Sequence, residues 1–313
     1  MKKELRFFKK IFIFSISTLI FSCGSDTVDN TNNDIKDIKD IENIDSVDDD
    51  ETSEMEDDQT DITTNNIVWK NWYLSIPIKN ASNKATSITY QDIIDNNLSP
   101  TEAEYFSLNE DGSYKMFTKF TGFTTSGQYS INEGKYCRTE LREYWQGNQD
   151  TNDNWYMDSG THILESTLKV DFAGGNNDTK VYVAQIHGKE TDNVTGNPAT
   201  VKIMWLNGEI IVDYYTKPKD GEEWSSNYDN KISFGNVENE KFTVKIKIEN
   251  GVFYFGLLCD TQNIDTKYTK VFDYKSNGYI HSNYFKTGNY FIWDKDSIEN
   301  AQVTLYDIIT NHF

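Results

Sequence analysis

The chain has 313 residues, in which 50 Asp and Glu outnumber 30 Lys and Arg, so its formal net charge is −20. This length allows one large β domain or two smaller ones. The acidic balance argues against nucleic acid as a partner, because phosphate binding requires a broad basic face. An anionic polymer could bind only where a few basic residues gather locally.

Residues 1–22 have the pattern of an export signal. Five basic residues precede the apolar run 11–21, which ends at Ser22-Cys23-Gly24. The run is too short to span a membrane comfortably. A cysteine at this point resembles the lipidation site of bacterial lipoproteins. We therefore expect Cys23 to anchor an exported protein to a membrane, at the outer membrane or the cell surface, with secretion as the alternative.

Residues 23–66 form an acidic segment. Between Asp26 and Asp61 there are 16 acidic residues, two lysines and no aromatic residue. Such a composition cannot bury enough apolar surface to fold. We interpret the segment as a disordered linker that holds a domain of residues 67–313 away from a membrane. A solvated tail without that role is the alternative.

The domain of residues 67–313 has the patterns of a β protein. Asn207-Gly208 and Asn250-Gly251 each separate two strand-like runs, which indicates two-residue hairpins. Helix signals are sparse, and only residues 88–96 favour a short helix. Without a linker or an internal repeat, the simplest all-β fold is one jelly-roll sandwich. The expected strands are 72–78, 161–172, 181–187, 201–206, 209–215, 242–249, 252–258, 290–293 and 302–309.

The domain contains two cysteines, Cys137 and Cys259. They could pair in an oxidising compartment. Cys137 lies on the expected core face of its strand, where a free buried thiol is equally compatible with the pattern. The sequence leaves both possibilities open.

Three strand-like segments place polar side chains on one face of a sheet. They are Arg138-Thr139-Glu140-Leu141-Arg142, Gln185-Ile186-His187 and Tyr284-Phe285-Lys286-Thr287-Gly288. Alternate residues of a strand share a face, so the polar residues would line a groove and the residues between them would face a core. The groove would offer guanidinium, amide, imidazole, phenol and amine groups. That set suits a sugar bearing a carboxylate and the transfer of a proton on it.

Each of these residues also has an ordinary structural interpretation. An isolated arginine on a strand most often forms a surface ion pair, here with Glu140 or Glu143. A lone His187 or Tyr284 is most often a packing residue. The combination of three segments favours a site instead. The remaining histidines, His162, His281 and His312, belong to no motif, and no spacing of His or Cys indicates zinc.

The three segments, with the third extended to Tyr290, resemble the signature regions of polysaccharide lyase family 7, the alginate lyases. They occur in the family's order and at similar separations. Residues 72–77 resemble the family's opening strand, so the similarity runs from Trp72 to the carboxyl end. The third segment departs from the family pattern, because Thr287 to Ile292 stand where Ala-Gly-Val-Tyr-Asn-Gln is usual. This departure affects sugar contacts more than the reacting centre.

The resemblance implies a β-jelly-roll that cleaves alginate, an anionic polysaccharide, by β-elimination without a metal or other cofactor. Arg138 and Gln185 would neutralise the uronate carboxylate and stabilise the enolate-like charge that develops on it. Tyr284 would be the acid that protonates the departing O4. Either His187 or Tyr284 itself would be the base that removes H5, depending on the face of the sugar that carries this proton.

The resemblance also implies how substrate is held. The expected substrate-binding residues are Glu140, Arg142, Lys286 and Tyr290, with Glu140 orienting the arginines. In the family, isoleucine at the position of Ile186 accompanies activity on guluronate-containing blocks. We therefore expect a preference for guluronate. We also expect the enzyme to be monomeric and endo-acting.

Two other functions fit parts of the pattern. A jelly-roll sandwich can bind glycans at a cell surface without cleaving them, but such a protein has no use for a proton-transfer pair. A glycoside hydrolase needs two carboxylates that flank the bond, and no recognisable hydrolase motif is present. Only elimination produces a conjugated unsaturated uronate, so ultraviolet absorbance of the product separates these functions.

Overall fold

The structure is a computed structural model that describes residues 65–130, 135–174, 180–188, 198–293 and 299–313. These residues belong to the compact unit Gln59–Phe313. The expected export signal, the lipidation site Cys23 and most of the acidic linker lie outside the described residues. No helix within the described ranges is long and apolar enough to cross a membrane.

The last two residues of the expected linker already contact the domain. The side-chain amide of Asn65 donates to Gly112 O at 3.1 Å, and Asn66 N donates to Asp307 Oδ1 at 2.8 Å. Ile67 follows with its side chain buried. Contacts with the sandwich therefore begin slightly before Ile67.

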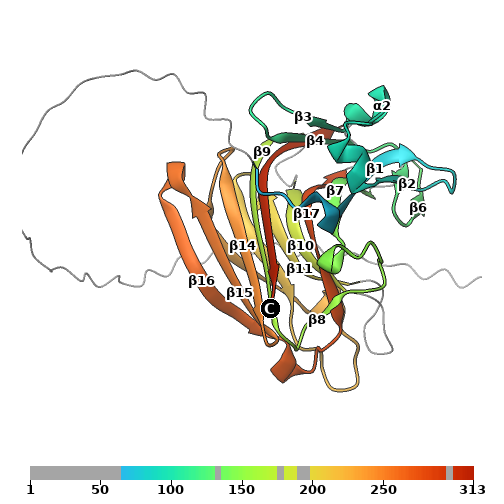
Figure 1. The fold of residues 1–313 in the computed structure, drawn as a ribbon. Helices are drawn as coiled ribbons and strands as arrows, with labels where there is room; N and C mark the ends of the chain where they lie inside the picture. Colours follow the sequence, from blue (N-terminus) through green and yellow to red (C-terminus); the bar gives the residue numbers. More distant parts are fainter. Residues whose placement is uncertain (1–64, 131–134, 175–179, 189–197, 294–298) are drawn as a thin grey trace, which may run out of the picture. The chain divides into compact units, whose positions relative to one another are not determined.

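Two antiparallel sheets form the domain (Figure 1), and the predicted jelly-roll sandwich is confirmed. The nine-stranded sheet has the spatial order β13 (Asp229–Asn236), β12 (Glu209–Tyr215), β11 (Ala199–Leu206), β10 (Lys180–Gly188), β17 (Ser282–Trp293), β7 (Lys135–Glu143), β1 (Trp72–Lys79) and β2 (Ala85–Ile88), with β8 (Trp155–Tyr156) paired to β17. The seven-stranded sheet has the order β16 (Ile264–Asp273), β15 (Val252–Cys259), β14 (Phe242–Glu249), β9 (Thr161–Ala173), β18 (Asn300–His312), β4 (Tyr114–Lys119) and β3 (Phe106–Leu108).

Smaller elements complete the described part of the domain. β5 (Phe123–Thr124) and β6 (Gly127–Gln128) form a separate two-stranded hairpin. The helix expected over 88–96 is the short α1 (Tyr90–Ile94), which begins after Thr89 because the Thr89 side chain caps the N–H of Asp92. A second short helix, α2 (Pro100–Ala103), follows it.

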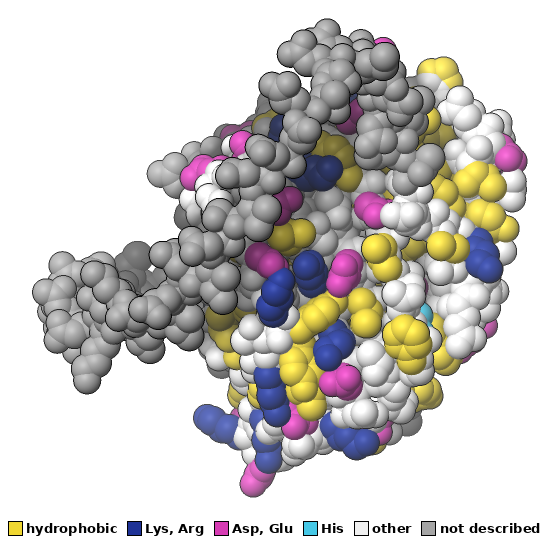
Figure 2. All heavy atoms as spheres, turned by 60° about the vertical axis from the view of Figure 1, so that its left-hand side comes forward, with side chains coloured by type: hydrophobic (Ala, Val, Ile, Leu, Met, Phe, Trp, Pro, Cys, Tyr) yellow, Lys and Arg dark blue, Asp and Glu magenta, His cyan; other side chains and the backbone are white. Residues whose placement is uncertain are grey.

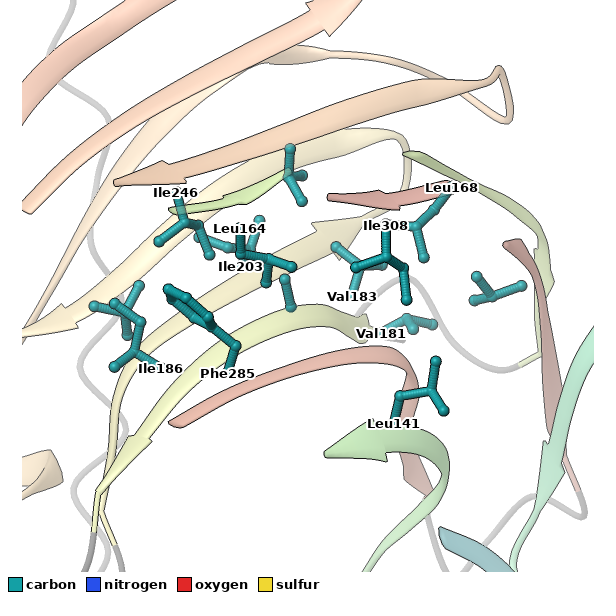
Figure 3. Packing of buried hydrophobic residues seen from close by; sticks show 14 of the residues in the cluster. Leu141, Leu164, Leu168, Val181, Val183, Ile186, Ile203, Ile246, Phe285 and Ile308 are labelled. Carbon is teal, nitrogen blue, oxygen red and sulfur yellow. The ribbon is translucent and has the colours of Figure 1, made fainter. Parts of the chain in front are cut away.

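The core lies between the two sheets and contains the residues that alternate with the polar motif residues. Leu141, Ile186 and Phe285 of the nine-stranded sheet are fully buried and, like Leu164 and Ile246 of the other sheet, lie in the hydrophobic cluster drawn in Figure 3. Thr139 is buried as well. The predicted inward orientation is confirmed, and it leaves the polar residues of the same strands on the outer face of the sheet.

Both predicted hairpins are confirmed. Asn207 and Gly208 have φ of 49° and 93°, and Asn250 and Gly251 have φ of 48° and 86°. Two successive positive φ values are the signature of a type I′ turn, which Asn-Gly adopts readily. The strands that the sequence missed include β13 and β16, which lie at the sheet edges. None of their residues is buried, so they lack a buried apolar face to reveal them.

The two cysteines of the domain, Cys137 and Cys259, are free and buried. Burial raises the pKa of the Cys137 thiol to about 12, so this group stays protonated at neutral pH. Of the two possibilities that the sequence left open, the structure shows the unpaired one.

The outer side of the seven-stranded sheet carries charges of both signs (Figure 2). On its strands Lys247 pairs with Glu249 at 3.3 Å and Lys270 pairs with Asp273 at 3.6 Å, while the exposed Lys267 pairs with Asp265. Exposed pairs of this kind add little stability.

Candidate active site

A cleft of about 450 Å³ lies on the outer face of the nine-stranded sheet. Five of its lining residues come from the three sequence motifs, on the neighbouring strands β7, β10 and β17. The lining residues are Tyr73, Ser75, Thr125, Ser126, Arg138, Arg142, His187, Tyr284 and Lys286. Residues more than 140 positions apart in the sequence are thus brought to one surface.

Strand register explains why these side chains meet. His187 of β10 lies opposite Tyr284 of β17, and Gln185 lies opposite Lys286. On the other side of β17, Lys286 lies opposite Arg142 of β7. Directly opposed residues of antiparallel strands share a face at about 5 Å, so the register alone assembles a continuous row of polar groups.

Tyr284 and His187 form the central pair of the cleft. Tyr284 Oη lies 3.1 Å from His187 Nδ1, and the two rings are stacked. His187 Nδ1 also lies 3.0 Å from Gly188 O. A carbonyl oxygen can only accept a hydrogen bond, so this contact assigns the proton of a neutral imidazole to Nδ1. His187 Nε2 is then unprotonated and able to accept a proton.

The protonation states of this pair are set mainly by burial. Burial, reinforced by the positive charge of Lys286, lowers the pKa of His187 to about 3, so the imidazole is neutral at pH 7. Burial raises the pKa of the Tyr284 phenol to about 12, although the Arg142 guanidinium 4.0 Å from its ring centre opposes this rise. The cleft therefore holds a neutral base beside a protonated phenol.

Glu140 lies beneath the cleft and connects three of the site residues. Its carboxylate is 1% exposed, accepts a hydrogen bond from the Gln185 amide, and pairs with Lys286 and, at 3.2 Å, with Arg138. The prediction that Glu140 binds substrate directly does not agree with this geometry, because its oxygens are occupied and an anionic sugar would be repelled. Glu140 contacts Arg138 as the expected role in orienting the arginines requires, and this role stays a prediction.

The two arginines of the first motif have different surroundings. Arg142 is 4% exposed, and its guanidinium donates to Thr151 O and to Asn154 Oδ1, both at 2.8 Å. Arg138 stacks on Tyr290, with 4.0 Å between guanidinium and ring centre, and its buried Nε has no hydrogen-bond partner within the described residues. Arg138 is therefore the arginine with donors to spare.

Two further predicted residues lie beside the cleft lining rather than in it. Tyr290 packs against the Arg138 guanidinium and is not among the residues that line the cleft, so its expected contact with substrate stays a prediction. Gln185 is 1% exposed and uses one amide N–H on Glu140. Its amide nitrogen has a second N–H, so Gln185 can still donate to a ligand.

Four lining residues lie outside the three motifs. They are Tyr73 and Ser75 of β1 and Thr125 and Ser126 of the turn between β5 and β6. Alternation with the buried Leu74 and Ile76 is a sequence signal that places Tyr73 on the outer face. The turn residues carry no such signal, because only the packing of the hairpin brings them to the cleft. No group of His, Cys, Asp or Glu in the described ranges is arranged to hold a metal ion.

The sandwich and its cationic cleft define a protein class that acts on acidic polysaccharides, and the comparison with known families identifies the family within it. A family model described as alginate lyase matches residues 66–312. The chain therefore belongs to the alginate lyase family, and it is a polysaccharide lyase that degrades alginate. No curated protein matches the sequence.

Solved structures have the same fold. Alginate lyase A1-II′, a member of polysaccharide lyase family 7, is 25% identical with a TM-score of 0.57, over 78% of this chain and 95% of that chain. A tyrosine-to-phenylalanine variant of A1-II′ in complex with the product GGG gives 25% identity and a TM-score of 0.57, over 78% and 96%. The alginate lyase from Klebsiella pneumoniae, at 18% identity and a TM-score of 0.58 over 78% and 96%, shows the fold alone.

The charge of Lys286 predicts a pH dependence of substrate binding. Burial, together with the positive charge of Arg138, lowers the pKa of Lys286 to about 8. As the pH rises through this value the cleft loses one positive charge, so we expect KM for alginate to rise about threefold or more between pH 7 and 9.5, with a smaller change in kcat. Initial rates of product absorbance measure both constants.

The matched control for this prediction is Lys286→Arg, because a guanidinium keeps its charge over the whole range. Its KM should stay nearly constant with pH. The same rise in KM in this variant and in the wild type would assign the effect to another group.

Proposed function

We propose that the enzyme cleaves the 1,4-bond between uronates by β-elimination at the pair formed by Tyr284 and His187. The observation that carries this proposal is the 3.1 Å contact between Tyr284 Oη and His187 Nδ1 in a cleft lined by Arg138, Arg142 and Lys286. A neutral base and a protonated acid that touch in a cationic cleft are what elimination next to a carboxylate requires.

Arg138 and Gln185 are suited to hold the uronate carboxylate. The proton on C5 is weakly acidic, so the negative charge that moves onto the carboxylate must be stabilised as it develops. Arg138 supplies a guanidinium fixed by Glu140 and Tyr290, and Gln185 supplies its second amide N–H. Both groups are oriented before substrate arrives, so little reorganisation accompanies the reaction.

The proton transfers follow from the tautomer of His187. Nε2 takes H5, the C5–H electrons form the C4–C5 double bond, and the C4–O4 bond breaks. The Tyr284 phenol gives its proton to O4 as the bond opens. The resulting phenolate lies 3.1 Å from the imidazolium Nδ1–H, which returns a proton to it. For mannuronate, whose H5 lies on the opposite face, Tyr284 itself is the alternative base.

The position of the pair supports cleavage within the polymer. β10, β17 and β7 lie in the middle of the nine-stranded sheet, with β11 to β13 on one side and β1 and β2 on the other. The outer face therefore extends past the pair in both directions. A polymer bound there can continue beyond the reacting bond at both ends, as endo action requires.

A preference for guluronate is supported by Ile186 and by one relative. Ile186 is fully buried behind Gln185 and His187, where its side chain can tilt the strand that carries them. The A1-II′ variant was solved in complex with the product GGG. With guluronate, His187 would be the base and Tyr284 the acid.

Initial rates on guluronate and mannuronate blocks test reaction and preference together. We expect ultraviolet absorbance of an unsaturated uronate with both, rising severalfold faster with guluronate blocks, and a loss of viscosity that precedes most of the absorbance. A faster rise with mannuronate blocks would reverse the preference and leave the elimination intact. Reducing ends that form without absorbance would exclude elimination.

We also propose that Cys23 carries a lipid that anchors the enzyme to a membrane. The support is the basic segment, the apolar run 11–21 and the cysteine that follows Ser22. Replacing Cys23 with Ser should move the protein from the membrane fraction to the soluble fraction, as measured by fractionation and immunoblotting. Identical distribution of both forms would contradict lipid attachment.

A further inference from the structure

A buried carboxylate lies directly behind the cleft and takes no part in the proposed reaction. Glu143 is the last residue of β7, is 1% exposed and faces the core. Its Oε2 accepts hydrogen bonds from Phe285 N at 2.8 Å and Trp155 Nε1 at 3.0 Å. Its Oε1 lies 2.7 Å from His312 Nε2. Four strands, β7, β8, β17 and β18, therefore meet at one carboxylate.

Glu143 lies where the nine-stranded sheet forks. β7 and β17 are paired as far as Arg142 and Lys286, and β17 then pairs with β8, where Asn283 lies opposite Trp155. At the fork the Phe285 N–H donates to the Glu143 side chain instead of a carbonyl of β7. Phe285 stands between Tyr284 and Lys286, so its backbone position sets the position of both cleft side chains.

The histidines behind Glu143 form a chain of contacts that ends on its carboxyl group. His162 Nε2 lies 2.8 Å from Ser159 O, His162 Nδ1 lies 2.8 Å from His312 Nδ1, and His312 Nε2 lies 2.7 Å from Glu143 Oε1. The chain connects β9 and β18 of the seven-stranded sheet with the residue that holds the Phe285 backbone.

The contact between Glu143 and His312 links the last strand of the chain, β18, to the fork beside Tyr284. A buried carboxyl group without hydrogen-bond partners would be strongly unfavourable. The contacts with Phe285, Trp155 and His312 supply these partners and fix the position of the Glu143 side chain.

We propose that Glu143 is a positioning residue for the elimination: it holds the Phe285 backbone, and the contact with His312, which is itself backed by His162, holds Glu143 in place. The inference rests on the proposed function, because it assumes that Tyr284 is the acid. It assigns a role to His162 and His312, two of the three histidines that no sequence motif explains.

Two variants at Glu143 test the positioning. Glu143→Leu removes every acceptor, so we expect kcat to fall about tenfold or more with KM within about twofold, since small misplacements of reacting groups are costly. Glu143→Gln can accept from Phe285 and Trp155 through its oxygen and donate to a neutral His312 through its amide. It should therefore rescue kcat to within about threefold of wild type.

An unchanged kcat in Glu143→Leu would overturn the inference, and so would equal losses in the two variants. If Glu143→Leu does not fold, His312→Leu replaces it as the test. The His312 variant removes the contact on Oε1 and leaves the two hydrogen bonds on Oε2, from Phe285 N and Trp155 Nε1. Its kcat should fall about threefold or more at unchanged KM. A wild-type kcat in His312→Leu would overturn the inference as well.

Tyr284→Phe separates the positioning from the proposed function. Full activity of that variant would refute the proposed function, whereas full activity of Glu143→Leu beside an inactive Tyr284→Phe would refute only the positioning.

Discussion

Replacing Tyr284 with Phe should lower kcat at least about a hundredfold, the usual size of a lost general acid or base. The change removes only the phenolic oxygen, which lies 3.1 Å from His187 Nδ1. The ring stays beneath the Arg142 guanidinium, 4.0 Å away, so packing and substrate binding are kept. Product absorbance gives kcat and KM, and we expect KM within about threefold and a thermal midpoint within about 2 °C of wild type.

Tyr290→Phe is the matched control, because Tyr290 lies on the same strand and also packs against an arginine, Arg138 at 4.0 Å. Its hydroxyl is not part of the pair with His187, so kcat should change little. Full activity of Tyr284→Phe with an unchanged thermal midpoint would assign the acid elsewhere. A large loss in both variants would attribute the effect to packing of the arginines.

Replacing Arg138 with Lys should lower kcat about a hundredfold or more, because stabilisation of developing negative charge by a fixed donor contributes about that much. Lysine keeps the charge but loses the planar group that stacks on Tyr290 and presents several N–H donors to a carboxylate. The pair with Glu140 can still form. We therefore expect a much larger change in kcat than in KM, measured by product absorbance at saturating alginate.

Arg142→Lys provides the comparison. The Arg142 guanidinium already donates to Thr151 O and Asn154 Oδ1, so this variant should lose thermal stability and less activity than Arg138→Lys. If Arg138→Lys retains its kcat while Arg142→Lys loses it, carboxylate stabilisation belongs to Arg142, and the assignment of the two arginines must be exchanged.

Local patterns in the sequence were sufficient for much of the fold. Alternation placed Ile186 and Phe285 in the core and left Gln185 and Tyr284 on the outer face. The Asn-Gly pairs identified hairpins because few residue pairs tolerate two positive φ values. These features depend on neighbours in the chain, so they can be read without knowing what the strand packs against. The edge strand β16 could not be predicted from such local patterns, because little of it is buried.

The sequence by itself determined which side chains of the three motifs lie on the outer face of the sheet, and the order of the strands decided which of them meet and what each contacts there. Glu140 stands in the same motif as both arginines, yet only the pairing of β7, β17 and β10 makes it the partner of Arg138, Lys286 and Gln185. Glu143 and His312 are separated by 169 residues and share no motif, and they meet because β18 of one sheet packs behind the fork of the other. Contacts between sheets arise from packing that no local pattern encodes, which is why the buried cluster behind the cleft required the tertiary structure.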